Sequence, residues 1–314
     1  MKNNVLITGA NGFVGENLLN YLSDYSRVQI LTRIQLNAVS VANLNEIDTI
    51  IHLAGKAHDL KKSVSPQEYY YVNFELTRKL YDAFLQSDAK KFIFISSVKA
   101  AADSVDGVLY ENVKTNPGTD YGKSKLMAEE YIESQPLPNG KSYYILRPCM
   151  VHGPGNKGNL NLLYKFVKMG IPYPFARFEN KRSFLSVQNL CFVIDKLITR
   201  DDIANGVYQI SDDEPLSTNE VVAILAVSLN AKAQLWKIST KLVKLTAKIG
   251  DLFHLPLTTE RLNKLTESYV VSNAKIKSAL NCGLPLTAIE GLRITANSFN
   301  KIQKLKNLKH NSII

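Results

Sequence analysis

The sequence lacks any long hydrophobic run and has little cysteine. No stretch of its 314 residues approaches the ~18 consecutive apolar residues that span a bilayer, which argues against an integral membrane protein. The first residues lead straight into a short apolar run with glycines, without the apolar core and cleavage site of a secretory signal. Cys149, Cys191 and Cys282 are too few and too scattered for a disulfide framework or a zinc site. We expect a cytoplasmic protein with no structural metal.

An excess of one charge sign is absent from most of the chain. The 38 Lys and Arg against 28 Asp and Glu give +10, yet residues 1–231 hold 24 of each sign. Residues 232–314 carry 14 basic and 4 acidic side chains, so any polyanion-binding role belongs to that segment. No helix-turn-helix, zinc-finger or RNP-type aromatic pattern accompanies the charge, and we therefore expect no nucleic-acid partner.

The basic segment contains apolar residues at helical spacing with lysines between them. The apolar positions are Leu235, Ile238, Leu242, Leu245, Ile249 and Leu252, and the lysines are Lys237, Lys241, Lys244 and Lys248. The pattern predicts an amphipathic helix packed on its own domain, with a solvated lysine face. Peripheral contact with an anionic membrane surface is the alternative.

Short apolar runs alternate with helical patterns in the first half of the chain, which is the rhythm of βαβ units. Strands are expected near 5–7, 27–31, 49–53, 91–95 and 142–146, and helices near 14–22, 67–85 and 122–134. The sequence thus predicts an α/β fold with a Rossmann-type, doubly wound parallel sheet. We place a dinucleotide-binding domain at 1–150 and a smaller, mostly helical substrate-binding region at 151–314, of which about 184–212 returns to the Rossmann core.

Three glycines at three-residue intervals follow the first expected strand, in Thr8-Gly9-Ala10-Asn11-Gly12-Phe13-Val14-Gly15. A tight turn, close backbone approach to a pyrophosphate, and tight helix–strand packing each require a missing side chain. The N-terminus of the following helix adds N–H groups for the anion. We therefore expect a dinucleotide to be bound by Gly9, Asn11, Gly12, Phe13, Val14 and Gly15.

The end of the second strand discriminates between the two nicotinamide dinucleotides. An acid there binds the ribose 2′-hydroxyl of NAD, whereas an arginine accommodates the 2′-phosphate of NADP. The residue here is Arg33, and no acid follows until Glu46. The sequence favours NADP(H), with NAD(H) as the alternative. Arg33 could instead be a solvated strand end.

A tyrosine and a lysine stand four residues apart at Tyr121 and Lys125, on one face if the segment is helical. The lysine cation and an oxidised nicotinamide would stabilise the phenolate and lower the pKa of Tyr121 from its usual ~10. The expected strand 91–95 ends in Ser96-Ser97, at the sheet edge where ligands collect. Ser97 could hydrogen-bond the reacting oxygen, so Ser97, Tyr121 and Lys125 form the candidate catalytic set.

Together these motifs resemble the extended short-chain dehydrogenase/reductases that act on nucleotide sugars. Further matching positions are His52-Leu53-Ala54-Gly55 at the family's fourth strand, Asn73, Leu146-Arg147-Pro148, Gly158-Asn159-Leu160 and the stretch from Asn180 to Val187. The resemblance implies that Leu53, Ala54 and Gly55 contact the cofactor, that Arg182 and Asn159 contact the substrate diphosphate, and that the protein is a homodimer. The short span between Arg33 and Thr49 implies that the family's third strand is reduced.

One departure from the family pattern narrows the reaction. Sugar 4,6-dehydratases of this family have Asp-Glu after the catalytic hydroxyl residue, whereas Val98-Lys99 follow Ser97 here. This string and His152-Gly153-Pro154-Gly155 look like bacterial UDP-4-keto-6-deoxy-HexNAc reductases, which form UDP-N-acetylquinovosamine (UDP-QuiNAc) or its C4 epimer UDP-FucNAc for surface polysaccharides. The resemblance places Lys99 at the substrate and implies reduction of a C4 ketone. The alternatives are a UDP-hexose or UDP-HexNAc 4-epimerase with tightly held NAD, and a non-catalytic NADP-binding protein.

Two further groups have a plain structural interpretation. His52 and His58 lie six residues apart without a nearby acid or cysteine, so we expect packing or loop residues and no metal site. Asp212-Asp213-Glu214 follows an expected strand at 207–210 and is interpreted as a solvated turn and not a cation site.

Overall fold

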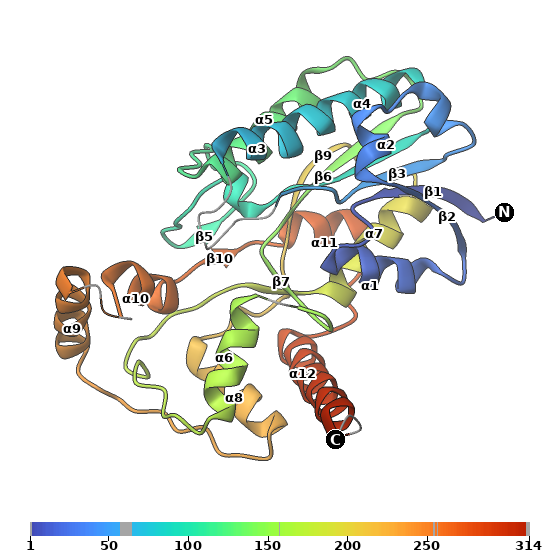
Figure 1. Ribbon diagram of the computed structural model, residues 1–314. Coiled ribbons are helices and arrows are strands. Elements are labelled where there is room, and N and C mark those ends of the chain that lie inside the picture. The colour runs from blue at the N-terminus through green and yellow to red at the C-terminus, as the bar shows by residue number, and fades with distance from the viewer. Residues whose placement is uncertain (1, 57–64, 157, 254, 256, 312–314) are drawn as a thin grey trace.

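A six-stranded parallel sheet forms the centre of the molecule, with the strand order β2-β1-β3-β4-β6-β9 (Figure 1). The computed structural model describes residues 2–56, 65–156, 158–253, 255 and 257–311. The strands are β1 (Asn3–Thr8), β2 (Ser26–Leu31), β3 (Thr49–His52), β4 (Lys91–Ile95), β6 (Ser142–Pro148) and β9 (Gly206–Ile210). The chain leaves β1 toward β2 on one side and continues through β3 on the other, so a topological switch point lies between β1 and β3. The predicted Rossmann-type α/β class is confirmed.

Helices cover both faces of this sheet (Figure 1). One face carries α1 (Phe13–Leu22), α7 (Val187–Thr199) and α11 (Ala274–Leu280), and the other carries α2 (Arg33–Asn37), α3 (Pro66–Tyr70), α4 (Leu76–Gln86) and α5 (Asp120–Ser134). The side chains of β1 alternate between the two resulting cores: Val5 and Ile7 belong to one, and Leu6 to the other. Burial on both faces explains why the strands are nearly continuous apolar runs.

The segment between β2 and β3 is short and contains α2 and the single turn η1 (Val41–Leu44). The run His52-Leu53-Ala54-Gly55 begins at the last residue of β3, and no strand lies between β2 and β3, a segment that the structure describes in full, as expected from the short span between Arg33 and Thr49. A π-helical turn, η2 (Tyr71–Glu75), separates α3 from α4 and carries Asn73. Such turns are often found at functional sites.

A second, mostly helical region lies beyond the carboxyl ends of the strands (Figure 1). It contains α6 (Asn159–Lys168), α8 (Thr218–Ser228) and α12 (Ala288–Asn311), packed around a core that includes Leu160, Leu225 and Leu292. Two small parallel sheets join it to the main body: β7 (Met150–His152) pairs with β8 (Phe184–Ser186), and β5 (Val108–Leu109) pairs with β10 (Val270–Val271). The strand β9 then takes the chain back beside β6.

The expected basic helix is shorter than its apolar pattern. α9 spans Thr240–Phe253 and is followed by α10 (Thr259–Thr266). Leu235 lies outside the helix, because residues 234–236 pair through their backbone with Tyr173. None of the described helices is long and apolar enough to cross a membrane.

The prediction of which face of α9 packs on the protein is also wrong. Its buried residues are Val243, Ala247 and Gly250, whereas the four predicted apolar positions in the helix are exposed, namely Leu242, Leu245, Ile249 and Leu252. The cause is a close approach of the backbone: a Cβ on Gly250 would lie 1.7 Å from the carbonyl oxygen of Leu257. Small side chains therefore face the protein and large ones face solvent.

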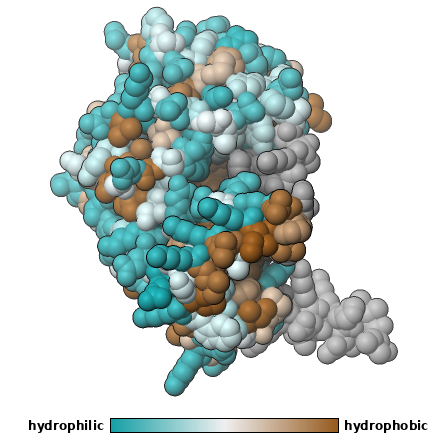
Figure 2. All heavy atoms as spheres, turned by 90° about the vertical axis from the view of Figure 1, so that its left-hand side faces the viewer, coloured by the Kyte–Doolittle hydropathy of each residue, from teal (hydrophilic) through white to brown (hydrophobic). Residues whose placement is uncertain are grey.

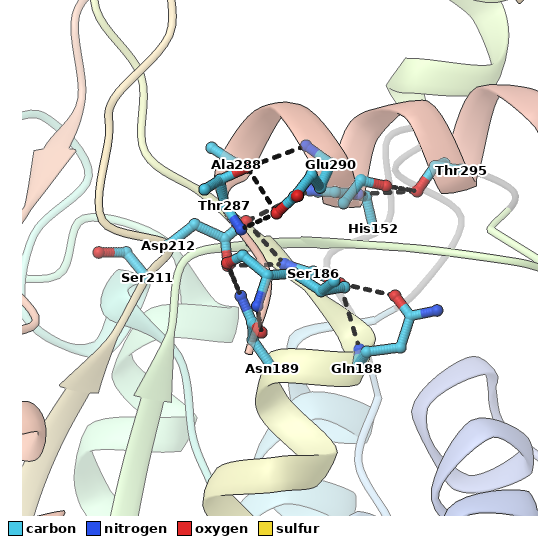
Figure 3. A network of polar contacts seen from close by, with 12 residues as sticks. His152, Ser186, Gln188, Asn189, Ser211, Asp212, Thr287, Ala288, Glu290 and Thr295 are labelled. Atoms are coloured by element: carbon cyan, nitrogen blue, oxygen red, sulfur yellow. Dashed lines mark hydrogen bonds and ion pairs between the residues drawn. The ribbon is translucent and has the colours of Figure 1, made fainter. Parts of the chain in front are cut away.

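Asp212, expected in a solvated turn, is instead buried in a polar network that joins β7, β8, α7 and α12 (Figure 3). Its carboxylate accepts hydrogen bonds from the Ser186 N–H at 3.0 and 3.1 Å and from Asn189 Nδ2 at 2.7 Å. His152 Nδ1 lies 2.9 Å from Thr295 Oγ1, and its Nε2 lies 3.8 Å from Asp212 Oδ2, beyond hydrogen-bond length. The network attaches the second region to the end of β9.

Candidate active site

The glycine turn after β1 lies at the switch point of the sheet. Gly9 has a φ of +73°, which few residues other than glycine adopt, and a Cβ there would lie 2.6 Å from the amide nitrogen of Ala54. A Cβ on Gly15 would lie 2.5 Å from the carbonyl oxygen of Gly9. The Ala54 N–H donates to Thr8 Oγ1 at 3.1 Å. These contacts hold the turn, the start of α1 and the loop after β3 against one another.

The N-terminus of α1 fits a pyrophosphate. Its N-cap is Gly12, which contributes no side-chain capping bond, so the first N–H groups of the helix face outward beside the exposed Asn11. A helix N-terminus of this kind attracts anions. The loop after β7 packs beside it, because Asn17 Nδ2 donates both to Phe13 O at 2.8 Å and to Pro154 O at 3.2 Å. The half-buried Phe13 and Val14 lie in the first turn.

Arg33 emerges at the same edge of the sheet. It is exposed and is the first residue of α2, two residues after β2 ends, and Leu31 of β2 is in register with Thr8 of β1. Thr32 and Gln35 form a capping box that fixes where α2 begins. Arg33 thus lies just past the end of the strand that neighbours the glycine turn.

The loop after β3 touches the predicted catalytic helix. A Cβ on Gly55 would lie 3.0 Å from Lys125 Nζ and 3.1 Å from Asn73 Oδ1. Asn73 accepts the Lys56 N–H at 2.7 Å and donates to Ser124 Oγ at 3.0 Å, so it joins the loop to α5. Of the expected cofactor residues after β3, Gly55 therefore lies beside Lys125, whereas Leu53 and Ala54 lie against the glycine turn at Gly9.

Lys125 is almost completely buried, with 4% of its surface exposed. Its Nζ donates to the carbonyl oxygen of Ile95 at 2.9 Å and lies 4.7 Å from the centre of the Phe94 ring. Burial lowers the pKa of Lys125 to about 8, and the nearby Glu129 opposes this change. An ammonium group has three donors, so further donors remain for hydroxyl groups of a cofactor or substrate.

A buried ion pair that the sequence analysis missed lies one turn further along α5. Arg147 Nε donates to both oxygens of Glu129, at 3.0 and 3.1 Å, and Ser96 Oγ donates to the same carboxylate. Burial raises the pKa of Glu129, and the hydrogen bond with Arg147 opposes it. The sequence did contain a signal, since Tyr121, Lys125 and Glu129 repeat every four residues on one helix face.

Ser97 and Tyr121 meet where α5 packs on the turn after β4. Ser97 caps the short helix η3 (Val98–Ala100) by accepting the Lys99 N–H at 3.2 Å. The close approach of α5 to the turn after β4 requires a glycine, because a Cβ on Gly122 would lie 2.4 Å from the carbonyl oxygen of Lys99. Burial raises the pKa of Tyr121, and a hydrogen bond with Ser97 opposes this effect. The expected lowering of the Tyr121 pKa is therefore not found in the protein alone, and the phenol is protonated at neutral pH.

Tyr269 connects Lys99, in the turn after β4, with the backbone at residues 181–183. Lys99 Nζ lies 4.5 Å from the centre of the Tyr269 ring, and the Tyr269 hydroxyl donates to the carbonyl oxygen of Ala102 at 2.7 Å. The backbone of Tyr269 pairs on its other side with residues 181–183. Arg182 thus lies across Tyr269 from the catalytic turn. Burial lowers the pKa of both Lys99 and Arg182, and the Arg182 charge contributes to the shift at Lys99.

A cavity of about 810 Å³ opens on the Arg182 side. It is lined by the two predicted diphosphate contacts, Asn159 and Arg182, and by Arg261 and Lys264 of α10. Arg182 Nη1 donates to the carbonyl oxygen of Lys264 at 2.5 Å. Ser97, Tyr121 and Lys125 do not line this cavity. The α10 cations had no motif by which sequence could identify them.

His52 has the packing role expected for it. It is fully buried, with Nδ1 2.6 Å from Thr8 Oγ1 and Nε2 2.9 Å from Thr77 Oγ1. Burial lowers the pKa of His52 to about 3, so the ring is neutral. His58 lies outside the described residues. No group of three or more His, Cys, Asp or Glu that could hold a metal occurs in the part of the chain that the structure describes.

The sequence matches known proteins over most of its length. The profile described as "NAD dependent epimerase/dehydratase family" matches residues 5–211. A UDP-glucose 4-epimerase of Vibrio cholerae is 32% identical, over 95% of this chain and 96% of the relative. An N-acetyl-alpha-D-glucosaminyl-diphospho-ditrans,octacis-undecaprenol 4-epimerase of Escherichia coli O157:H7 is 29% identical over 88% of this chain and 85% of its own. A UDP-2-acetamido-2,6-beta-L-arabino-hexul-4-ose reductase of Pseudomonas aeruginosa is 32% identical, over 50% of this chain and 38% of its own.

Solved structures share the fold at lower identity. MoeE5 in complex with UDP-glucuronic acid and NAD superposes with a TM-score of 0.74 at 21% identity, covering 96% of this chain and 100% of the other. RMD from Pseudomonas aeruginosa complexed with NADPH has a TM-score of 0.73 at 19% identity, with coverage of 96% and 100%. At these identities the likeness concerns the fold.

Proposed function

Because the chain belongs to the NAD dependent epimerase/dehydratase family, we propose that it reduces the C4 ketone of a nucleotide-linked 6-deoxy amino sugar with NADPH. The substrate is a UDP-4-keto-6-deoxy-HexNAc and the product is UDP-QuiNAc or UDP-FucNAc. The observation that carries the choice of a reductase is Arg33, which stands beside the glycine turn where NAD enzymes place an acid. Two nicotinamide-binding proteins of this fold hold NAD and NADPH respectively.

The reaction uses the buried face of α5. Bound NADPH supplies a hydride to C4. Tyr121 donates its phenolic proton to the ketone oxygen, Ser97 hydrogen-bonds that oxygen, and the Lys125 cation stabilises the phenolate that remains. The products are a C4 alcohol and NADP⁺, and the phenolate regains its proton from water. Reduction starts from the protonated phenol, which is the form that the raised pKa of Tyr121 favours.

The diphosphate of the substrate is held at the other end of the site. Arg182 and Asn159 line the cavity together with Arg261 and Lys264 of α10, and Lys264 is paired with Glu260, which also lines it. The two arginines leave a positive charge that suits a diphosphate. Lys99 lies between this cavity and Ser97, against the Tyr269 ring. We propose that Lys99 contacts the substrate where the sugar joins the diphosphate. We also propose that the protein works in the cytoplasm as a homodimer.

A 4-epimerase is the second candidate, favoured by the printed functions of two relatives that match most of the chain. Such an enzyme would use the same residues but start from a Tyr121 phenolate, removing a proton from the C4 hydroxyl while tightly bound NAD⁺ takes the hydride. The hydride would then return to the opposite face of the ketone. A non-catalytic NADP-binding protein is the third candidate, and it would need neither Tyr121 nor Ser97.

The test combines cofactor retention with turnover. The purified protein is denatured and the released nucleotide identified, and NADPH oxidation is then followed with UDP-2-acetamido-2,6-dideoxy-xylo-hexos-4-ulose, with the product sugar analysed by NMR. We expect no retained NAD, steady NADPH oxidation, and a loss of at least about a hundredfold in kcat for Tyr121→Phe. Tyr110→Phe, at an exposed tyrosine, is the matched control. Retained NAD with interconversion of UDP-GlcNAc and UDP-GalNAc would establish the epimerase instead, and binding of NADPH without either reaction would establish the third candidate.

A further inference from the structure

The outer face of α9 is an apolar surface bordered by lysines, and we propose that it docks on an anionic lipid bilayer. We call the exposed side chains Leu242, Leu245, Ile249, Leu252 and Phe253 the α9 face. The proposal goes beyond the reaction and does not depend on it.

The side chains of the α9 face are largely exposed to solvent. Leu245 is 55% and Leu252 72% exposed, and Figure 2 shows apolar side chains gathered on the side of the molecule that carries α9 and α10. At about 100° per residue, the five side chains occupy one continuous stripe along the helix. The opposite stripe, with Val243 and Ala247, packs on Leu262 of α10. The helix is thus held to the protein by one side and presents large apolar groups on the other.

Charge identifies the kind of partner. Lys241, Lys244 and Lys248 are exposed and lie along one border of the α9 face. Residues 232–253 contain five lysines and a single acid, Asp251, whose carboxylate accepts hydrogen bonds from the N–H and the hydroxyl of Thr259. By the helical spacing Asp251 lies on the same side of α9 as Lys244 and Lys248, and the three lysines leave an excess of positive charge there. An apolar stripe with lysines along one border is the pattern of a helix that lies in the plane of an anionic membrane surface. A core-like protein interface would place far less charge beside its apolar centre.

The geometry places the open cavity next to this surface. α10 packs on α9 through Leu262 and lines the cavity with Arg261, Lys264 and the exposed Leu265. A bilayer bound by the α9 face would therefore lie beside the diphosphate end of the site. Since the main sheet lies on the far side of α10 in Figure 1, docking would leave the cofactor edge in water.

The test is co-sedimentation of the full chain with phosphatidylcholine vesicles that contain phosphatidylglycerol, and with vesicles of phosphatidylcholine alone. We expect binding to the first that weakens as salt is added, and little binding to the second. Replacing Lys241, Lys244 and Lys248 together by Gln should weaken partitioning by about a hundredfold. Replacing Leu245 and Leu252 by Asn should weaken it by tenfold or more.

Matched control variants remove side chains of the same kind, lysines and an apolar residue, from other parts of the surface. Lys2, Lys90 and Lys114 are exposed and lie outside α9, so their joint change to Gln removes the same charge. Ile34→Asn removes an apolar side chain that is 82% exposed on α2. Both controls should bind vesicles as the unchanged protein does. If the control variants lose as much vesicle binding as the α9 variants, binding does not depend on the α9 face, and the proposal is overturned.

A spectroscopic measurement locates the contact. The chain has one tryptophan, Trp236, so Trp236→Phe combined with Leu245→Trp puts a single reporter on the α9 face. Its emission should shift to the blue with anionic vesicles, whereas Ile34→Trp in the same background should not change. Unshifted emission would contradict docking through α9. If the original protein does not bind anionic vesicles and the α9 variants change the molar mass of the free protein, the face is a contact between two copies of the chain and the proposal is overturned.

Discussion

Lys125 and Glu129 lie one helical turn apart on α5, both buried, and the carboxylate of Glu129 is the one negative charge that raises the pKa of Lys125. The lysine points to the carbonyl oxygen of Ile95 and the glutamate to Arg147. The charged form of Lys125 is therefore favoured, in a buried setting, by a carboxylate whose own hydrogen bonds are made with Ser96 and Arg147. The ion pair behind the site thus helps to set the pH range in which the enzyme can work.

Activity should fall in alkaline solution. Because burial lowers the pKa of Lys125 to about 8, the group is cationic below that pH and neutral above it. We expect kcat/KM for ketone reduction to decrease by about tenfold per pH unit above 8. The measurement is a pH profile of initial rates, compared with Lys125→Met. The variant should be slower by about 10² to 10⁴ and should show no break near pH 8; an identical break in both proteins would assign the titration to another group.

Removing the glutamate should destabilise the protein. In Glu129→Gln the Arg147 cation stays buried without a carboxylate, which costs about 3–5 kcal/mol of unfolding free energy. Urea unfolding measures the loss. The exposed neighbour gives a control, Glu130→Gln, with an expected change within about 0.5 kcal/mol. In the double variant with Arg147→Met part of the stability should return; a Glu129→Gln protein as stable as the original would mean that the carboxyl is already neutral in the fold.

The choice of cofactor should depend on Arg33. Replacing it by Ser removes the cation beside the glycine turn but leaves the Thr32 and Gln35 cap in place. We expect KM for NADPH to rise by about 10- to 100-fold and KM for NADH to change little, since only NADPH carries the 2′-phosphate. Arg27→Ser on β2 removes the same charge from the start of the strand and should have no effect on either KM. Equal effects on both cofactors would show that Arg33 does not read the 2′-phosphate.

Acid should destabilise the protein through His52. Its pKa is about 3 in the fold and about 6.5 in an unfolded chain, so between these values only the unfolded state binds the proton. Stability from this source is complete above pH 6.5 and falls by about 1.4 kcal/mol per pH unit toward pH 3. Unfolding free energies at pH 7 and pH 5 should therefore differ by about 2 kcal/mol more in the original protein than in His52→Gln. Parallel pH dependence of the two proteins would contradict this assignment.

The sequence identified those candidate site residues whose place in the fold follows from the residues next to them in the chain. Gly9 and Gly15 could be assigned because a turn between a strand and a helix is written in consecutive residues, and Lys125 because helical spacing sets its face. Tyr269 and Lys264 reach the site from far along the chain, where no short motif marks them. The burial of Asp212 and the reversed face of α9 were also missed, because each depends on a distant backbone: that of Ser186 in one case and of Leu257 in the other.

Tyr269 holds the backbone at Arg182 and the turn after β4 at a fixed separation. One side of this residue pairs with the backbone at Arg182, and its hydroxyl bonds to the carbonyl oxygen at the end of the catalytic turn. The separation between the Arg182 cavity and the phenol of Tyr121 is consequently held by two backbone hydrogen bonds of Tyr269 and by the bond from its ring hydroxyl. Under the proposed function, a sugar whose carbonyl lies one bond nearer to the diphosphate, or one bond further from it, would be bound by its phosphates but would not reach the Tyr121 hydroxyl.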